Sequence, residues 1–93
     1  KPKRVTPKLK DELADAPEDV KRLFEELRQW RLQLSREISK PAYTIFTDRT
    51  LMAIADAKPE TLIQLRAIPG IGATKSEKYG ADVLKIIRDF AGE

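Results

Sequence analysis

Apolar residues recur every three or four positions between residues 20 and 38, the spacing that places them on one face of an α-helix. Upstream of this stripe, Asp15, Pro17 and Glu18 match a helix N-cap, a first-turn proline and a capping-box acid. Pro41 prevents continuation of the helix, which we expect to end near Ser39. The pattern therefore predicts a long amphipathic helix whose core-facing residues are Val20, Leu23, Phe24, Leu27, Trp30, Leu34 and Ile38.

The segment after this helix is short and bounded by proline. Residues 41–46 are predicted to form an extended connector that Ile45 and Phe46 anchor to the core. Thr47 then has the side chain and the position of an N-cap. A second helix is therefore predicted over about residues 48–57.

The C-terminal half gives a similar pattern of short helices. One is predicted over about residues 60–67, and another begins near Ala73 and meets a break or kink at Gly80. A last helix is predicted over about residues 81–90. No segment alternates with a period of two residues, so the sequence predicts an all-α fold: a compact bundle of about five helices with a helix-hairpin-helix-like turn.

That turn is the sequence Ile-Pro-Gly-Ile-Gly at residues 68–72. Two glycines separated by one apolar residue allow a sharp turn and leave N–H groups uncovered at the start of the next helix. A helix start of this kind favours anions, including a nucleic-acid phosphate. The alternative is a tight turn whose glycines only allow two helices to pack. The candidate residues for phosphate binding are Gly70, Ile71, Gly72, Thr74, Lys75 and Lys78.

Composition excludes most catalytic chemistry. The 93 residues contain neither histidine nor cysteine, so the usual zinc sites and the Ser–His and Cys–His nucleophile pairs cannot form. Carboxylates are scattered among lysines and arginines, as on solvated helix faces. We expect no catalytic residue, metal or cofactor, and no membrane span or secretory signal, which suits an intracellular protein.

Charge divides the chain into two parts. Residues 1–12 carry five basic and two acidic side chains, whereas residues 13–93 carry thirteen of each. We therefore expect a basic flexible linker at 1–15 and a folded domain at 16–93. Within the long helix, basic residues gather at 28–40, either to complement the helix dipole or to form a basic patch beside the next loop.

Five segments carry a family resemblance, in order and at the right spacing: Leu23-Phe24-x-x-Leu27-Arg28-x-Trp30-Arg31, Pro41-Ala42-Tyr43-x-Ile45-Phe46-x-Asp48-x-Thr50-Leu51, Lys58-Pro59-x-Thr61, Ile68-Pro69-Gly70-Ile71-Gly72 and Lys78-Tyr79-Gly80. Over about residues 18–90 the chain resembles the HRDC domain (helicase and RNase D C-terminal). HRDC domains are five-helix bundles that act as accessory modules of RecQ-family helicases, some UvrD/Rep-type helicases and RNase D-type nucleases. The resemblance implies a non-catalytic part of a larger enzyme, most simply an ATP-dependent DNA helicase of DNA repair or recombination.

The resemblance also implies a binding loop. In bacterial RecQ-type members the loop corresponding to residues 41–46 contacts DNA, so Tyr43 becomes the candidate for base stacking. Arg36, Lys40 and Arg49 are candidates by proximity for contacts to the backbone. The alternative for Tyr43 is a partly buried core ring.

Two functions follow as expectations. The first is an accessory domain that binds single-stranded or branched DNA weakly and without sequence specificity, so as to orient the substrate for a helicase motor. The second is a docking module for other domains of the parent enzyme or for partner proteins, which the zero net charge of residues 13–93 favours. A small bundle with a polar surface is most simply a monomer.

Overall fold

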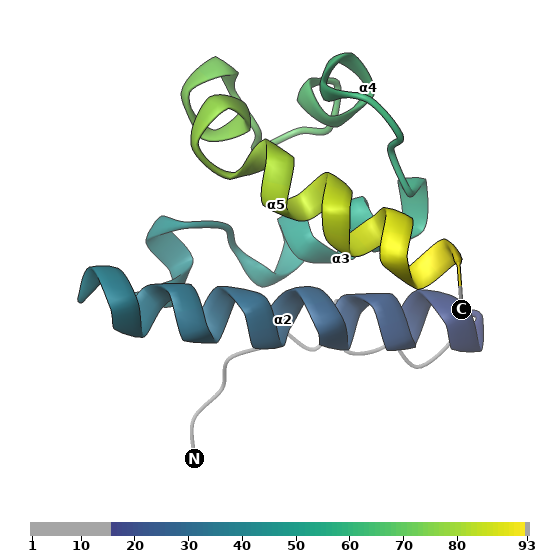
Figure 1. Ribbon diagram of the computed structural model, residues 1–93, viewed down its shortest axis with the longest axis horizontal. Coiled ribbons are helices and arrows are strands. Elements are labelled where there is room, and N and C mark those ends of the chain that lie inside the picture. Colours follow the sequence, from purple (N-terminus) through teal and green to yellow (C-terminus); the bar gives the residue numbers. More distant parts are fainter. Residues whose placement is uncertain (1–15, 93) are drawn as a thin grey trace.

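The computed structural model describes residues 16–92, all of whose regular elements are helical (Figure 1). The predicted linker at residues 1–15 lies outside the described residues. The four α-helices and one 3₁₀ turn of the described part agree with the predicted all-α class. In chain order the elements are α2 (Glu18–Ile38), η1 (Ala42–Thr44), α3 (Asp48–Ala57), α4 (Leu62–Arg66) and α5 (Ala73–Ala91).

The long helix α2 forms where the apolar stripe predicts it, but its start differs. Pro17 occupies the N-cap position and no side chain caps the helix, so the prediction of Asp15 as N-cap is wrong. Asp15 itself lies outside the described residues. Glu18 and Asp19 in the first turn place negative charge at the positive end of the helix dipole. At the other end Ser39 adopts the left-handed conformation (φ 56°) and ends the helix at Ile38, one residue before the expected boundary.

The predicted stripe is the core-facing side of α2. Val20, Leu23, Phe24 and Leu27 are buried, whereas Trp30, Leu34 and Ile38 are half-buried. Beyond Leu27 the buried positions of α2 are polar: Arg31 and Ser35 follow Leu27 in steps of four residues. The buried face of α2 therefore changes from apolar to polar along its length.

The two middle helices begin at threonine caps. The Thr47 hydroxyl accepts a hydrogen bond from the Thr50 N–H at 3.2 Å, which confirms the predicted cap of α3. Thr61 does the same for the N–H of Gln64 at the start of α4. Each threonine satisfies one of the N–H groups that a helix start leaves without a partner.

The C-terminal region is one helix rather than two. Of the break or kink expected at Gly80, the break is wrong, because α5 runs without interruption from Ala73 to Ala91. Gly80 is instead buried where α4 crosses α5: a Cβ there would lie 2.6 Å from Leu62 Cδ2 and 3.4 Å from Leu65 Cδ2. Glycine at this position thus permits a close approach between two helices, and a helix interior tolerates it at a modest cost.

Figure 1 shows how the elements are layered. The helix α2 runs along one side, α3 and α5 lie over it, and α4 packs on α5 away from α2. The end of α5 returns to the start of α2, where the guanidinium carbon of Arg22 lies 5.2 Å from the centre of the Phe90 ring. The largest fully buried side chains come from every one of these layers: Phe46, Leu23, Leu27, Ile45, Leu51, Ile54, Leu65 and Val83.

Three aromatic rings close one end of this core. Phe46 lies 5.7 Å from Tyr79 and 6.2 Å from Trp30, and Trp30 lies 6.1 Å from Tyr79, all between ring centres. Two of the three pairs are edge-to-face, an arrangement that aromatic rings favour. Trp30 is therefore a core residue, as its place in the stripe predicts.

Candidate nucleic-acid interface

The loop between α2 and α3 separates inward-facing from outward-facing side chains. Ile45 and Phe46 are buried, as predicted for the residues that anchor this connector. Tyr43, on the 3₁₀ turn that Pro41 begins, is 68% exposed. The alternative of a partly buried core ring is therefore excluded, and Tyr43 presents an aromatic ring to solvent.

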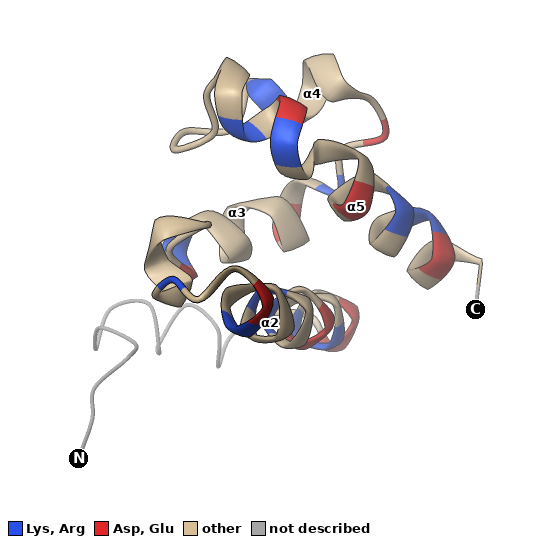
Figure 2. Cartoon of the chain, turned by 60° about the vertical axis from the view of Figure 1, so that its left-hand side comes forward, with Lys and Arg blue, Asp and Glu red and all other residues tan. Residues whose placement is uncertain are grey.

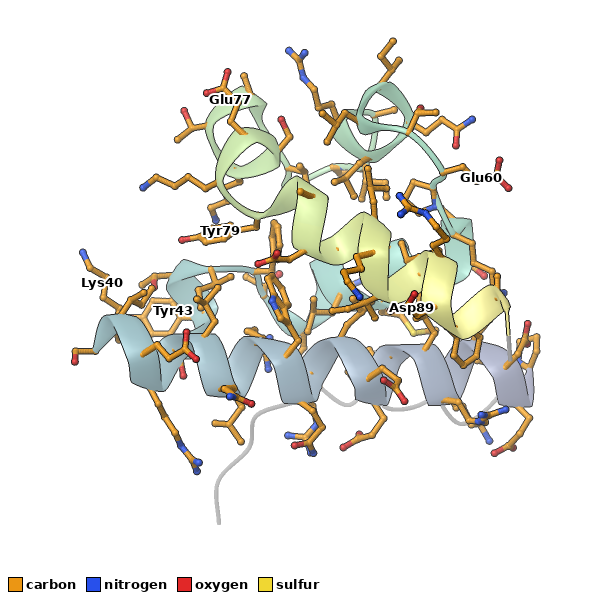
Figure 3. The ribbon with its side chains drawn as sticks, in the orientation of Figure 1. Lys40, Tyr43, Glu60, Glu77, Tyr79 and Asp89 are labelled. Carbon is orange, nitrogen blue, oxygen red and sulfur yellow. The ribbon has the colours of Figure 1, made fainter. Side chains whose placement is uncertain are left out.

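Part of the predicted basic surface lies at the same end of the molecule as this ring. Lys40 and Tyr43 lie at the same end of α2 in Figure 3, and both are exposed. Arg36, in the last turn of α2, is also exposed. Arg49 instead lines a shallow groove with Ala16, Pro17, Met52, Ala53 and Asp56, and no residue of the Tyr43 loop contributes to that groove.

The other two arginines of the segment 28–40 are engaged elsewhere. Arg28 pairs with Glu25 at 2.9 Å, and this hydrogen bond raises the pKa of Arg28 and lowers that of Glu25. Arg31 is only 9% exposed: its Nη2 lies 2.7 Å from Asp48 Oδ1, and its Nη1 donates to the Phe46 carbonyl oxygen at 2.9 Å. The predicted basic patch beside the loop is therefore reduced to Arg36 and Lys40.

Sequence reasoning counted Arg31 as a surface charge and missed its role. A signal was present, because Arg31 lies four residues after Leu27 and so falls on the buried face of the helix. The structure shows that this one side chain contacts both the end of the Tyr43 loop and the start of α3.

The glycine turn joins α4 to α5, and its two glycines differ. Gly70 has a φ of +96°, and a Cβ at this position would lie 2.6 Å from the Thr50 hydroxyl oxygen. Gly72 is extended (φ −99°, ψ −176°), and a Cβ there would meet no atom within 4 Å. Ile71 between them is buried. The positive φ and the packing against Thr50 therefore explain why residue 70 is glycine, whereas neither backbone conformation nor packing requires glycine at position 72.

The start of α5 is open in the manner that phosphate binding requires. Gly72 is its N-cap, and no side chain caps the helix. Thr74 and Lys78 are exposed in the first two turns, and Lys75 is half-buried. These features are compatible with an anion at the helix start and equally with solvation by water.

The tertiary structure brings the two candidate surfaces together. Lys75 Nζ lies 5.7 Å from the centre of the Phe46 ring, and Phe46 belongs to the same loop as Tyr43. Figure 2 shows basic residues in the first turns of α5, and Figure 3 shows Tyr79 of α5 at the same end of the molecule as Tyr43 and Lys40. The Tyr43 loop and the hairpin are therefore neighbours, although they are about thirty residues apart in sequence.

A groove of about 620 Å³ lies at the opposite end, between the α3–α4 connection and the end of α5. Its walls include Leu84, Ile87 and Phe90, with the Asp19–Lys58 ion pair at 2.9 Å on its edge. Among residues 16–92 no group of three acidic side chains is placed to hold a metal ion. In the same part of the chain no helix is long and apolar enough to cross a membrane.

The geometry defines a small helical domain with an exposed aromatic loop beside a glycine hairpin. The family model for the HRDC domain matches residues 20–87. The chain therefore belongs to the HRDC family, as the sequence resemblance indicates.

Comparison with individual proteins gives the same family. The chain is 49% identical over 75 residues to the ATP-dependent DNA helicase UvrD2 of Mycobacterium tuberculosis, a match that covers 81% of this chain and 10% of that helicase. It is 40% identical over 68 residues to the ATP-dependent DNA helicase RecQ of Pasteurella multocida, covering 73% of this chain and 11% of that one. The chain thus spans about a tenth of the length of these relatives.

A solved structure described as D. radiodurans RecQ HRDC domain 3 superposes with a TM-score of 0.73. It is 37% identical in sequence, and the match covers 76% of this chain and 93% of that one. The predicted fold and family are therefore both confirmed.

Proposed function

We propose that this domain is an accessory, non-catalytic part of a DNA helicase that binds single-stranded or branched DNA weakly and without sequence specificity. In this proposal it orients the DNA for the motor. The exposed ring of Tyr43 carries the proposal, because every base has a face that can stack on an aromatic ring. The names of the relatives, both ATP-dependent DNA helicases, support the choice of parent enzyme.

The charges around the loop support a modest electrostatic contribution. Residues 16–92 carry thirteen basic and eleven acidic side chains, so the domain has little net positive charge. Four candidate cations lie at the end that contains Tyr43: Arg36, Lys40, Lys75 and Lys78. With a salt slope of about −0.7 per neutralised phosphate on a single strand, we expect a total slope no steeper than about −3.

The hairpin enters the proposal as a second contact for the same strand. Its open helix start and the exposed Thr74 and Lys78 lie next to the Tyr43 loop through the Lys75–Phe46 contact. In this proposal a strand that stacks on Tyr43 continues toward the start of α5. Arg49 belongs to a different groove, and we assign it at most a peripheral contact.

The test measures binding of a fluorescent oligothymidylate by anisotropy at low and moderate salt. Stacking contributes about 1–3 kcal/mol per base, so Tyr43→Ala is expected to weaken binding by about 5- to 150-fold. Tyr43→Phe keeps the ring and should bind nearly as the native chain does. Unchanged affinity in Tyr43→Ala would remove the central support of the proposal.

The second candidate function, protein docking, has a specific observation in its favour. Ile63 on α4 is 80% exposed, next to the partly exposed Leu62, and Leu32 on α2 is also exposed. Contiguous exposed apolar side chains often mark contacts, and Leu62 and Ile63 are consecutive on α4. NMR shift mapping with the oligonucleotide distinguishes the two functions: shifts centred on Tyr43 support DNA binding, whereas a chain that shows no shifts at low salt is better explained by docking through α4.

A further inference from the structure

Arg31 contacts both sides of the junction between the Tyr43 loop and α3. Its Nη1 donates to the Phe46 carbonyl oxygen, the last residue of the Tyr43 loop before the Thr47 cap. Its Nη2 contacts the carboxylate of Asp48, the first residue of α3, at 2.7 Å. One planar guanidinium on α2 thus fixes where the loop ends and where the next helix begins.

This arrangement is unusual in its burial. Arg31 and Asp48 have side chains only 10% and 13% exposed. Within residues 16–92 the Nε atom of Arg31 is buried without a hydrogen-bond partner. A buried ion pair pays a large desolvation cost and is often no more stabilising than apolar residues of similar volume. What an arginine contributes here that an apolar residue does not is a rigid fork that reaches two acceptors at a fixed spacing.

The fixed spacing of the two Arg31 contacts matters because the loop must keep the Tyr43 ring turned toward solvent. Tyr43 lies three residues before Phe46, and its ring points outward while Ile45 and Phe46 are buried. The Phe46 ring is held by Trp30 and Tyr79, and its carbonyl is held by Arg31. Since only Thr44 and Ile45 separate Tyr43 from Phe46, the position of the Phe46 backbone limits how the turn at residues 42–44 is presented.

We propose that Arg31 is a positioning residue for the Tyr43 site: through the Phe46 carbonyl and Asp48 it holds the loop in the orientation that presents the Tyr43 ring to a single strand. This inference rests on the proposed function. Arg31 itself is too buried to contact a phosphate, so its effect on binding must pass through the loop.

The test is a double-mutant cycle between Arg31→Lys and Tyr43→Ala, with oligothymidylate binding measured by anisotropy at low salt. Lysine keeps the charge but lacks the fork, so Arg31→Lys is expected to weaken binding about fivefold in the native background. In the Tyr43→Ala background the same change should alter affinity less than twofold. The matched control is Arg28→Lys, an exposed position on the same helix that should leave affinity unchanged.

A second variant tests whether the affinity rises or falls when the contact between Arg31 and Asp48 is weakened. Asp48→Asn keeps the shape of the side chain and adds one net positive charge to the domain. Simple electrostatics predicts tighter binding of a polyanion, whereas loss of the charge-assisted contact to Arg31 predicts weaker binding. We expect Asp48→Asn to bind two- to fivefold more weakly, with urea unfolding used to confirm that each variant is folded.

The outcomes separate the two proposals. If Tyr43→Ala weakens binding but Arg31→Lys has no effect, or has the same effect in both backgrounds, the positioning role is wrong and the proposed function stands. If Tyr43→Ala binds as the native chain does, the proposed function is wrong, and so is the positioning role of Arg31, which rests on it.

Discussion

Gly70 and Gly72 belong to the same five-residue turn, yet the structure predicts opposite responses to alanine. Gly70 has a φ of +96°, which side chains with a Cβ rarely adopt, and its α-carbon faces the buried hydroxyl of Thr50. Gly72 has extended backbone angles and open space where a Cβ would lie. Alanine should therefore be much more costly at the first position than at the second.

The expected cost at Gly70 has two parts. Forcing a residue with a Cβ into this backbone region costs roughly 1–3 kcal/mol. The new methyl would lie 2.6 Å from Thr50 Oγ1, which is itself held 3.0 Å from the Thr47 hydroxyl at the start of α3. Relieving that overlap costs about 1–3 kcal/mol more, as overpacking usually does. Gly70→Ala should thus lower the free energy of unfolding by roughly 2–4 kcal/mol once partial relaxation is allowed.

Urea unfolding followed by circular dichroism measures the difference directly. Gly72→Ala serves as the matched control, since it makes the same chemical change two residues away, and it should lower the free energy of unfolding by no more than about 1 kcal/mol, the cost of alanine in place of glycine at a helix N-cap. A further variant divides the two parts of the cost: in a Thr50→Ala background the overlap disappears, so Gly70→Ala should retain only the backbone part, about 1–3 kcal/mol.

Equal effects of the two alanine variants would refute this reasoning, because they would show that the turn does not distinguish the two glycines. An undiminished cost of Gly70→Ala in the Thr50→Ala background would leave the backbone explanation intact and reject the steric one.

Two other predictions follow from single contacts. Added to Leu62→Ala, Gly80→Ala should raise the free energy of unfolding by about 0.5–1 kcal/mol over Leu62→Ala alone, because the helix gains the propensity of alanine and the overlap with Leu62 is gone. Urea unfolding of Gly80→Ala in the native background should show no such gain, because the overlap with Leu62 remains. The hydrogen bond from Lys58 holds the pKa of Asp19 below its ordinary value of 3.8. The stabilisation from this pair should therefore be complete above about pH 5, where the carboxyl is ionised in both the folded and the unfolded chain, and be lost as the pH falls through the lowered pKa. Lys58→Met should move the Asp19 pKa back upward in an NMR titration of its carboxyl carbon, and an unchanged pKa would contradict the assigned cause.

Much of this protein could be predicted from the sequence because the information is local. The stripe from Val20 to Ile38 predicts α2, since the spacing of apolar residues alone decides which face is buried. Thr47 caps α3 within three residues of itself, so its role could be recognised from its neighbours. The five ordered segments identified the HRDC family for the same reason, because their spacing is a property of the chain.

The errors at Gly80 and Arg31 share one physical cause, which is that the decisive contacts join residues far apart in sequence. From the sequence alone, Gly80 predicts a helix break. In the structure, Leu62 of α4 occupies the space that a side chain at position 80 would fill. Arg31 reads as a surface charge until Phe46 and Asp48 are placed against it.

The candidate site shows the same division. The sequence by itself determined the all-α class, the family, and the residues of the Tyr43 loop and of the hairpin. Only the tertiary structure decided that Tyr43 is exposed, that Arg49 belongs to another groove, and that the two candidate surfaces meet at Phe46 and Lys75. Exposure and proximity depend on how the helices pack, and packing is set by the whole core rather than by any one segment.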